Sequence, residues 1–116
     1  MQLKHNIHLA YCTNIHRGQN WPETFQTLKQ YTLRVRDRVA KGKLYAIGLR
    51  LSNQAAVELS NRATLTEFQR WLERENCYVF TINGFPYGTF HGGRVKELAY
   101  LPDWSTKERV DYRKLF

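Results

Sequence analysis

Residues 77–96 read CYVFTINGFPYGTFHGGRVK, and this stretch decides the fold. A nearly unbroken apolar run at 78–82 ends abruptly at Asn83 and Gly84, where a loop rich in aromatic residues, glycine and proline begins. A strand that is apolar on both faces is typical of a parallel sheet covered by helices. Ligands of such sheets bind beyond the carboxyl ends of the strands, so the sequence predicts a site at this loop.

Two further apolar runs, at 7–12 and 44–51, predict strands. Between them, the sequence predicts a helix at about 21–39, with Asn20 as its N-cap and a glycine shortly after its end. One stripe of residues spaced three or four apart is expected to face the sheet. The stripe consists of Trp21, Phe25, Leu28, Thr32, Val35 and Val39.

Helical segments also follow the second and third predicted strands. Ser52 is in position to cap a helix at 53–60, and a second helix is predicted at about 64–75. The inward side of that second helix is predicted to consist of Leu65, Phe68, Trp71 and Leu72. Ser105 and Glu108 have the spacing of a capping box, which predicts a last helix near the end of the chain.

The predicted order is strand, helix, strand, helix pair, strand, helix, without a hairpin signal. Consecutive βα units build right-handed crossovers and a parallel sheet. Three such units are too few to close a barrel, which needs eight strands and roughly 250 residues. We therefore expect an α/β domain spanning residues 1–116 that forms the first part of something larger. Alone, its apolar strand edges are expected to cause aggregation, association or partial unfolding.

The composition adds constraints on partners and location. Eighteen Lys and Arg against ten Asp and Glu give a formal charge of +8, so an anionic partner is plausible. Eight of these eighteen cations are assigned to the solvated backs of two predicted helices: Lys29, Arg34, Arg36 and Arg38 in one, and Lys107, Arg109, Arg113 and Lys114 in the other. Without a signal peptide or an apolar span of about 20 residues, we expect a cytoplasmic protein whose Cys12 and Cys77 are reduced, packed thiols.

Several blocks, in this order, resemble the amino-terminal third of the EboE-type metabolite traffic proteins. They are HLAYCTNIH at 8–16, GLRLS at 48–52, YVFTINGFPYGTFHG at 78–92, VKE at 95–97 and YLPDW at 100–104. The resemblance spans essentially the whole chain, and the NGFPYG-x-FHG block is specific. It implies a xylose-isomerase-like TIM barrel, the superfamily of sugar-phosphate isomerases and epimerases and of endonuclease IV. It also implies a role in moving a secondary metabolite out of the cytoplasm, with an undefined reaction.

In a parallel barrel, the ends of the three strands point to one mouth. Asn14, Arg50 and Asn83 are therefore expected to converge on one ligand as substrate-binding residues. Arg50 is the sharpest candidate because a guanidinium at the end of an apolar strand needs an anion, such as a phosphate or carboxylate of the metabolite. The alternative is an internal salt bridge with a barrel carboxylate.

His16 and His91 are the candidate catalytic residues, because each can act as an acid, a base, a hydroxyl-binding donor or a metal ligand. The alternative is that each simply forms hydrogen bonds in a loop. His91 is the candidate metal ligand, since superfamily barrels can place a metal-binding histidine just beyond the third strand. Most metal ligands of the superfamily lie on later strands, so a divalent metal is expected only in a full-length protein.

The loop after the third strand offers further substrate-binding candidates. Phe85, Tyr87 and Phe90 can form an apolar wall over a sugar or a larger aromatic metabolite. The alternative is that their rings only pack the loop, as we also expect of Trp71 and Trp104. Lys96 ends a segment, HGGRVK, that resembles an anion cradle in composition but matches no P-loop.

Three functions follow from these expectations. The first is an isomerase-like or epimerase-like barrel that binds a small polar metabolite at the strand ends. The second is a carrier on the same barrel that performs no chemistry. The third, nucleic-acid binding like that of endonuclease IV, is disfavoured because the basic residues are scattered along the chain.

Overall fold

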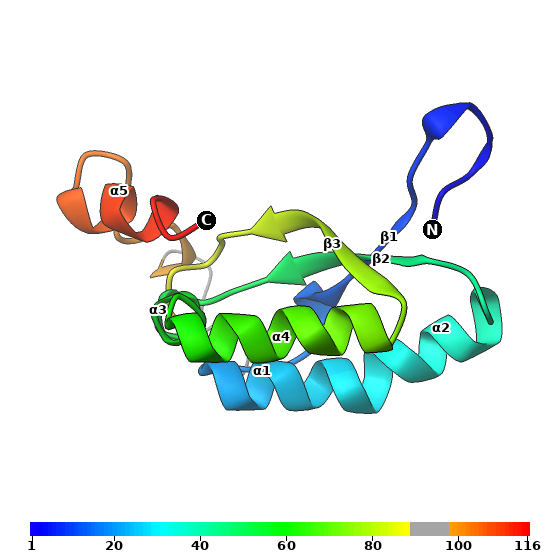
Figure 1. Cartoon of the computed structure of the whole chain (residues 1–116). Helices are drawn as coiled ribbons and strands as arrows, with labels where there is room; N and C mark the ends of the chain where they lie inside the picture. Colours follow the sequence, from blue (N-terminus) through cyan, green and yellow to red (C-terminus); the bar gives the residue numbers. More distant parts are fainter. Residues whose placement is uncertain (89–97) are drawn as a thin grey trace.

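The computed structural model describes residues 1–88 and 98–116, which form a three-stranded sheet flanked by helices (Figure 1). The strands are β1 (Ala10–Cys12), β2 (Tyr45–Arg50) and β3 (Cys77–Asn83). They lie in the order β1-β2-β3, and both neighbouring pairs are parallel. The predicted α/β class and parallel sheet are confirmed. The described residues form an open sheet and do not by themselves show a barrel.

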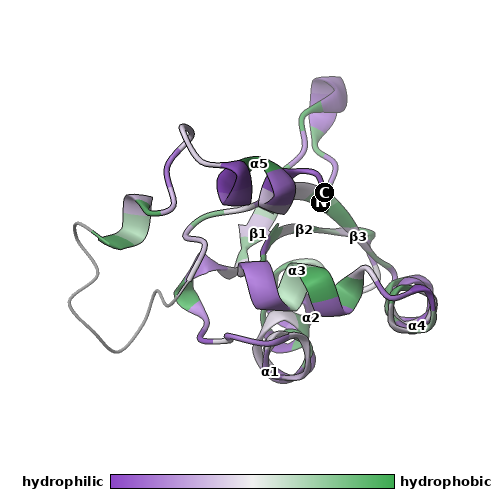
Figure 2. Ribbon diagram, turned by 90° about the vertical axis from the view of Figure 1, so that its left-hand side faces the viewer, coloured by the Kyte–Doolittle hydropathy of each residue, from purple (hydrophilic) through white to green (hydrophobic). Residues whose placement is uncertain are grey.

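The helices occupy mainly one side of this sheet. They are α1 (Trp21–Thr27), α2 (Leu33–Val39), α3 (Asn53–Leu59), α4 (Arg62–Arg74) and α5 (Lys107–Arg113). Helices α1, α2 and α4 run along one face of the sheet, whereas α5 lies across the sheet from α1 and α4, near the carboxyl ends of the strands (Figures 1 and 2). The carboxyl edge of the sheet is therefore bordered by α5 and the segment that leads to it.

Side-chain caps define where three of the helices begin. An Asn or Ser oxygen accepts a hydrogen bond from a backbone N–H of the first turn in each case. The pairs are Asn20 with Glu23 (2.9 Å), Ser52 with Ala55 (3.1 Å) and Asn61 with Ala63 (3.0 Å). Gly42 follows α2 with a φ of +72°, a conformation that glycine adopts without strain. The caps predicted at Asn20 and Ser52 and the glycine after α2 are confirmed, and Asn61 caps α4 in addition.

The predicted capping box of the last helix is wrong. The Ser105 hydroxyl and N–H both donate to the Asp103 carboxylate, at 2.5 and 2.9 Å, and α5 begins only at Lys107. A carboxylate two residues upstream closes a local turn that competes with helix capping. These hydrogen bonds hold the pKa of Asp103 below its ordinary value.

The core lies between β2 and the helices on one face. All six residues of β2 are buried, and four aromatic rings from α1 and α4 pack against one another with centroid distances of 4.8 to 5.9 Å. These rings belong to Trp21, Phe25, Phe68 and Trp71. Leu65, which the pattern places on the inward side of α4, is 39% exposed, so that part of the prediction is wrong.

The stripe predicted for residues 21–39 is correct in its first half only. Leu28 and Thr32 are fully buried, but Val39 is 60% exposed and Ala40 takes its place in the core. The cause is a π-helical turn, Leu28–Thr32, between α1 and α2. Its wider i to i+5 hydrogen bonding adds a residue to the turn, which rotates the inward face of α2 by one position.

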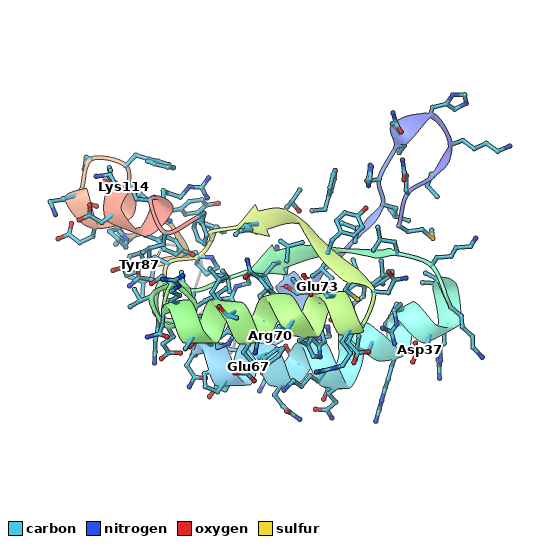
Figure 3. The ribbon with its side chains drawn as sticks, in the orientation of Figure 1. Asp37, Glu67, Arg70, Glu73, Tyr87 and Lys114 are labelled. Atoms are coloured by element: carbon cyan, nitrogen blue, oxygen red, sulfur yellow. The ribbon has the colours of Figure 1, made fainter. Side chains whose placement is uncertain are left out.

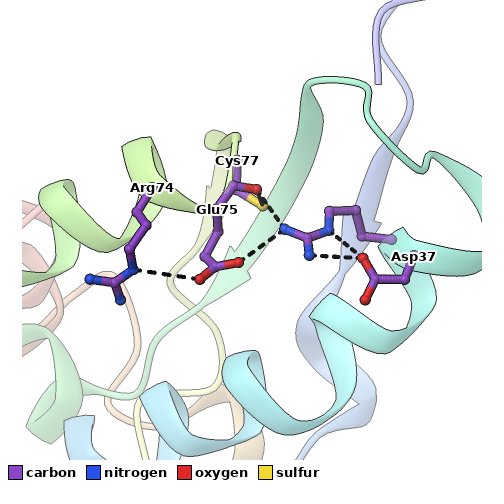
Figure 4. Close-up of polar contacts among 5 residues, drawn as sticks. Asp37, Arg74, Glu75 and Cys77 are labelled. Atoms are coloured by element: carbon purple, nitrogen blue, oxygen red, sulfur yellow. Dashed lines mark hydrogen bonds and ion pairs between the residues drawn. The ribbon is translucent and has the colours of Figure 1, made fainter.

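Arg36 on the rotated face of α2 joins this helix to the start of β3 (Figure 4). Its Nη1 donates to the backbone oxygen of Glu75 at 2.6 Å and lies 3.3 Å from the Glu75 carboxylate. Its Nη2 lies 2.8 Å from Asp37. Although burial alone lowers the pKa of Arg36, the bonds to Asp37 and Glu75 outweigh it and raise that pKa. Burial also raises the pKa of the neighbouring Cys77 thiol.

The two outer strands are less buried than the sequence predicts. Phe80 and Ile82 of β3 are 48% and 41% exposed, and Cys12 of β1 is exposed rather than packed. An edge strand has a neighbour on one side only, so an apolar run does not guarantee burial there. Near the start of the chain, Gln2 pairs with His8 in an antiparallel bridge that the sequence did not reveal, and β1 begins only at Ala10.

Candidate functional site

Polar residues at the ends of all three strands lie at one edge of the sheet. Asn14 lies in a short helical turn directly after β1, Arg50 is the last residue of β2, and Asn83 is the last residue of β3. Arg50 and Asn83 are partners in the strand register, and the Asn83 amide donates to Asn14 Oδ1 at 3.2 Å. The side chains of Asn14 and Asn83 therefore meet at the carboxyl edge, whereas the Arg50 side chain bonds to Gly18. Convergence of all three on one ligand stays a prediction.

Arg50 is buried at this edge and fastens the loop that follows β1. The residue is only 4% exposed, and its Nη1 donates a hydrogen bond to the backbone oxygen of Gly18 at 3.3 Å. Its backbone N–H donates to Thr13 Oγ1 at 2.8 Å. Burial lowers the pKa of Arg50. The cleft beside it has a volume of about 10 Å³, which admits a water molecule at most.

His16 borders the same small cleft, on the side of the π-helical turn. Its Nε2 lies 2.9 Å from the Tyr11 hydroxyl, and its ring stacks on Tyr31 with a centroid distance of 5.1 Å. These contacts give His16 a packing and hydrogen-bonding role. Its catalytic role stays a prediction.

The two described aromatic side chains of the loop after β3, Phe85 and Tyr87, contact different parts of the molecule. Phe85 approaches Tyr100 with a centroid distance of 5.5 Å, whereas Tyr87 packs on Tyr112 of α5 at 5.2 Å (Figure 3). The Tyr87 carbonyl also accepts a hydrogen bond from Asn53 at 3.0 Å. Phe85 and Tyr87 thus pack on different rings, and their role as a wall over a ligand stays a prediction. Phe90, His91 and Lys96 lie outside the described residues.

Two residues of α5, Arg109 and Tyr112, are buried beside this edge. Arg109 was assigned to a solvated helix face but is 4% exposed, with its Nε donating to the Pro102 oxygen at 2.6 Å and its Nη1 directed to the Gly84 oxygen at 3.5 Å. Tyr112 donates its hydroxyl proton to the Leu51 oxygen. Their spacing of three residues, which puts both on one helix face, was the available signal.

A pocket of about 420 Å³ opens between the β3 loop and the segment leading to α5. Its lining consists of Gly84, Phe85, Tyr100, Asp103, Trp104, Arg109 and Arg113. Trp104 was expected to be packed but is 69% exposed, because it forms part of this open wall. The volume falls within the range of small-molecule sites.

A shallower groove of about 640 Å³ lies on the opposite side of the molecule, between α1 and α4. The buried rings of Phe25 and Trp71 contribute to its lining, and its cations are Lys29, Arg62, Arg70 and Arg74. Glu67 adds one carboxylate, and it lies with Arg70 on α4 (Figure 3). Lys29 Nζ stands 3.8 Å from the centroid of the Phe25 ring.

The side chains at the carboxyl edge are not those of a metal site. Within residues 1–88 and 98–116, no group of three or more His, Cys, Asp or Glu residues is arranged to hold a metal ion. Asn14, Arg50 and Asn83 offer amides and a cation, a donor set that does not fit Mg²⁺, Mn²⁺ or Zn²⁺.

Comparisons with family models, with curated proteins and with solved structures found no match to this chain. In the part of the chain that the structure describes, no helix has the length and apolar character needed to cross a membrane.

Proposed function

We propose that this chain contributes the first three βα units of a xylose-isomerase-like barrel that binds a small polar metabolite in EboE-type metabolite traffic. The sequential order β1-β2-β3 and the helices α1, α2 and α4 along one face support this proposal. A barrel keeps its helices on the outer face, whereas a doubly wound sheet has helices on both faces. The assignment to this family and to a barrel rests on the sequence resemblance.

The observation that carries the proposed site is the Asn83 to Asn14 hydrogen bond beside the register partner Arg50. Two amides fixed against each other present further donors and acceptors to the hydroxyl groups of a sugar or hydroxy acid. The Arg50 guanidinium is buried beside a cleft that admits only water, so it favours a phosphate or carboxylate at this edge through its charge and not by direct contact. The proposed ligand class is therefore a small anionic polyol, such as a sugar phosphate.

Carriage of such a metabolite is the function that this geometry supports best. Asn14, Arg50 and Asn83 can bind a ligand, but they do not provide the carboxylates or the metal on which an isomerase of this superfamily relies. The alternative is that the protein is an isomerase-like enzyme. Its catalytic acid, base or metal ligands would then come from residues other than Asn14, Arg50 and Asn83. Metal analysis of the full protein separates the two forms, because stoichiometric Mn, Zn or Mg favours catalysis and metal-free protein favours carriage.

The binding site is tested with Asn83→Asp in the protein that carries this chain. The substitution preserves shape but replaces the amide donor to Asn14 with a carboxylate, which repels an anion. We expect the affinity for xylulose 5-phosphate or ribulose 5-phosphate, measured by calorimetry, to fall at least tenfold, roughly 1.4 kcal/mol.

Asn61→Asp is the matched control, since it makes the same change at the N-cap of α4, where Asp serves as well as Asn. Equal affinities of the two variants, or the absence of sugar-phosphate binding by the unmodified protein, would contradict the proposed site.

Nucleic-acid binding is a second candidate, and the cation-lined groove between α1 and α4 favours it. Binding through phosphates predicts an affinity for DNA that falls steeply with salt. Arg70→Gln should then reduce both the affinity and the salt dependence. A flat salt response removes this candidate.

A further inference from the structure

The pocket between the β3 loop and α5 combines an aromatic wall with fixed cations. Phe85 and Tyr100 form one side with a ring-centroid distance of 5.5 Å and an interplanar angle of 46°. Trp104 lines the same pocket and is 69% exposed, as is Tyr100. Large exposed rings that converge on one concavity are typical of a binding site for a flat apolar group.

Two arginines give this pocket a positive charge. Arg109 is buried and held by the carbonyl groups of Pro102 and Gly84, so its position is fixed before any ligand arrives. Arg113 places its guanidinium carbon 5.9 Å from the Trp104 ring centroid and 5.6 Å from that of Phe116. Stacking on rings orients a guanidinium and leaves its edge available for a carboxylate.

One carboxylate in the lining limits how much negative charge the pocket accepts. Asp103 is fixed by the hydroxyl and N–H of Ser105, and these bonds favour its ionised form. Two guanidinium groups and one carboxylate leave a net charge of +1 in the lining. A ligand with a single negative charge therefore matches the pocket better than a doubly charged phosphate ester.

We infer that this pocket binds a planar aromatic monocarboxylate, with its ring against Phe85, Tyr100 and Trp104 and its carboxylate at Arg113. The site begins at Gly84, the residue after Asn83, but its lining includes none of the side chains of Asn14, Arg50 and Asn83. Gly84 is suited to this border because a Cβ there would collide with the ring of Phe116 and lie 2.8 Å from Arg113 Nη1. The inference goes beyond the proposed metabolite site and does not depend on it.

The probe for this site is 2-naphthoate, compared with neutral 2-naphthamide and with acetate. Among the three tryptophans, Trp21 and Trp71 are buried and Trp104 is exposed. Saturable binding of 2-naphthoate should therefore shift the indole N–H resonance of Trp104, which Trp104→Phe identifies by its loss. We expect 2-naphthamide and acetate to bind at least tenfold more weakly, because each lacks one of the two recognised features.

Arg113→Gln tests the cation, and Lys114→Gln is the matched control at the next residue, the C-cap of α5 (Figure 3). Lys114 does not line the pocket and its side chain is 71% exposed. We expect Arg113→Gln to weaken 2-naphthoate binding about tenfold with little change for 2-naphthamide, and Lys114→Gln to change neither.

Equal binding of the acid and the amide, an unchanged affinity in Arg113→Gln, or no shift of the Trp104 resonance at millimolar 2-naphthoate would overturn the inference. Sugar-phosphate binding that responds to Asn83→Asp but not to Arg113→Gln would support the proposed metabolite site at Asn83 independently of the pocket at Trp104. The two proposals therefore fail separately.

Discussion

Tyr112 links α5 to the end of β2 through one buried hydroxyl. The residue is 1% exposed, and its hydroxyl donates to the carbonyl oxygen of Leu51, directly after β2. Burial raises the pKa of Tyr112 to about 12, although the nearby Arg50, Arg109 and Arg113 oppose this rise. The phenol must therefore stay protonated for α5 to remain docked at the carboxyl edge.

Tyr112→Phe should lower the free energy of unfolding near pH 8 by about 1 kcal/mol, because the Leu51 oxygen loses its buried donor. At higher pH this difference should shrink and then reverse. Above pH 10, the unfolded chain releases the Tyr112 proton, whereas the folded chain retains it until about pH 12. The unmodified protein therefore loses about 1.4 kcal/mol per pH unit in this window relative to the variant.

Urea unfolding of both proteins at pH 8, 10 and 11.5 measures this change. The other tyrosines titrate in both proteins, so their effects cancel in the comparison. A difference between the two proteins that stays constant with pH would contradict the predicted burial of the phenol.

At the level of elements, the π-helical turn decides which side chains α2 presents to the rest of the molecule. The turn brings Ala40 into the core in place of Val39 and directs Arg36 toward the residue pair that precedes β3. Arg36 thereby joins α2 to Glu75, which lies 39 residues later and just before β3. A half-buried cation with a backbone oxygen and a carboxylate as partners is costly to remove.

Arg36→Gln should lower the free energy of unfolding by about 2 kcal/mol, since the Glu75 oxygen and carboxylate lose a charged donor. Arg38→Gln, at an exposed position on the same helix, should change it by less than about 0.5 kcal/mol. Urea denaturation of both variants measures the two effects.

A double-mutant cycle with Glu75→Gln separates the two bonds of Arg36. If the backbone oxygen at 2.6 Å dominates over the carboxylate at 3.3 Å, the coupling between Arg36 and Glu75 side chains will be well below the full effect of Arg36→Gln. Equal effects of Arg36→Gln and Arg38→Gln would show that the contact does not stabilise the fold.

At the scale of the whole molecule, the sheet has two edge strands and an incompletely covered surface. Phe80 and Ile82 of β3 and Leu9 before β1 are each between 41% and 58% exposed. Unpaired backbone groups and apolar side chains together form a template for association. The net charge of +8 opposes close approach of two copies, so association should strengthen as added salt screens that charge.

The isolated 116-residue chain should therefore sediment at masses above 13.8 kDa, with the heavier fraction growing with concentration and salt. Ile82→Lys should shift it toward the monomer, because a lysine on an edge strand disfavours pairing. Val57→Lys is the control, since Val57 is 52% exposed on α3, away from the sheet edge. A cooperative, monomeric melt of the unmodified chain would contradict this prediction, as would equal responses of the two lysine variants.

Local patterns in the sequence were sufficient for much of the architecture. The apolar runs around Tyr45 and Tyr78 predicted strands, and Asn20 and Ser52 marked helix starts, because these signals act over a few neighbouring residues. The parallel direction of the strands then implied that Asn14, Arg50 and Asn83 would end at one edge, and they do.

Other features were decided only in the folded structure, some by local alternatives that the patterns do not distinguish and others by partners distant in the chain. The π-helical turn places Ala40 instead of Val39 in the core. Phe80 is exposed because its strand lies at the edge of the sheet. Ser105 donates to the Asp103 carboxylate and therefore does not cap α5. The sequence determined the elements and their order, since propensity, capping and periodicity are local. The burial of Arg109 and the pocket at Trp104 arose only when α5 packed against Gly84, because burial is a property of the assembled surfaces.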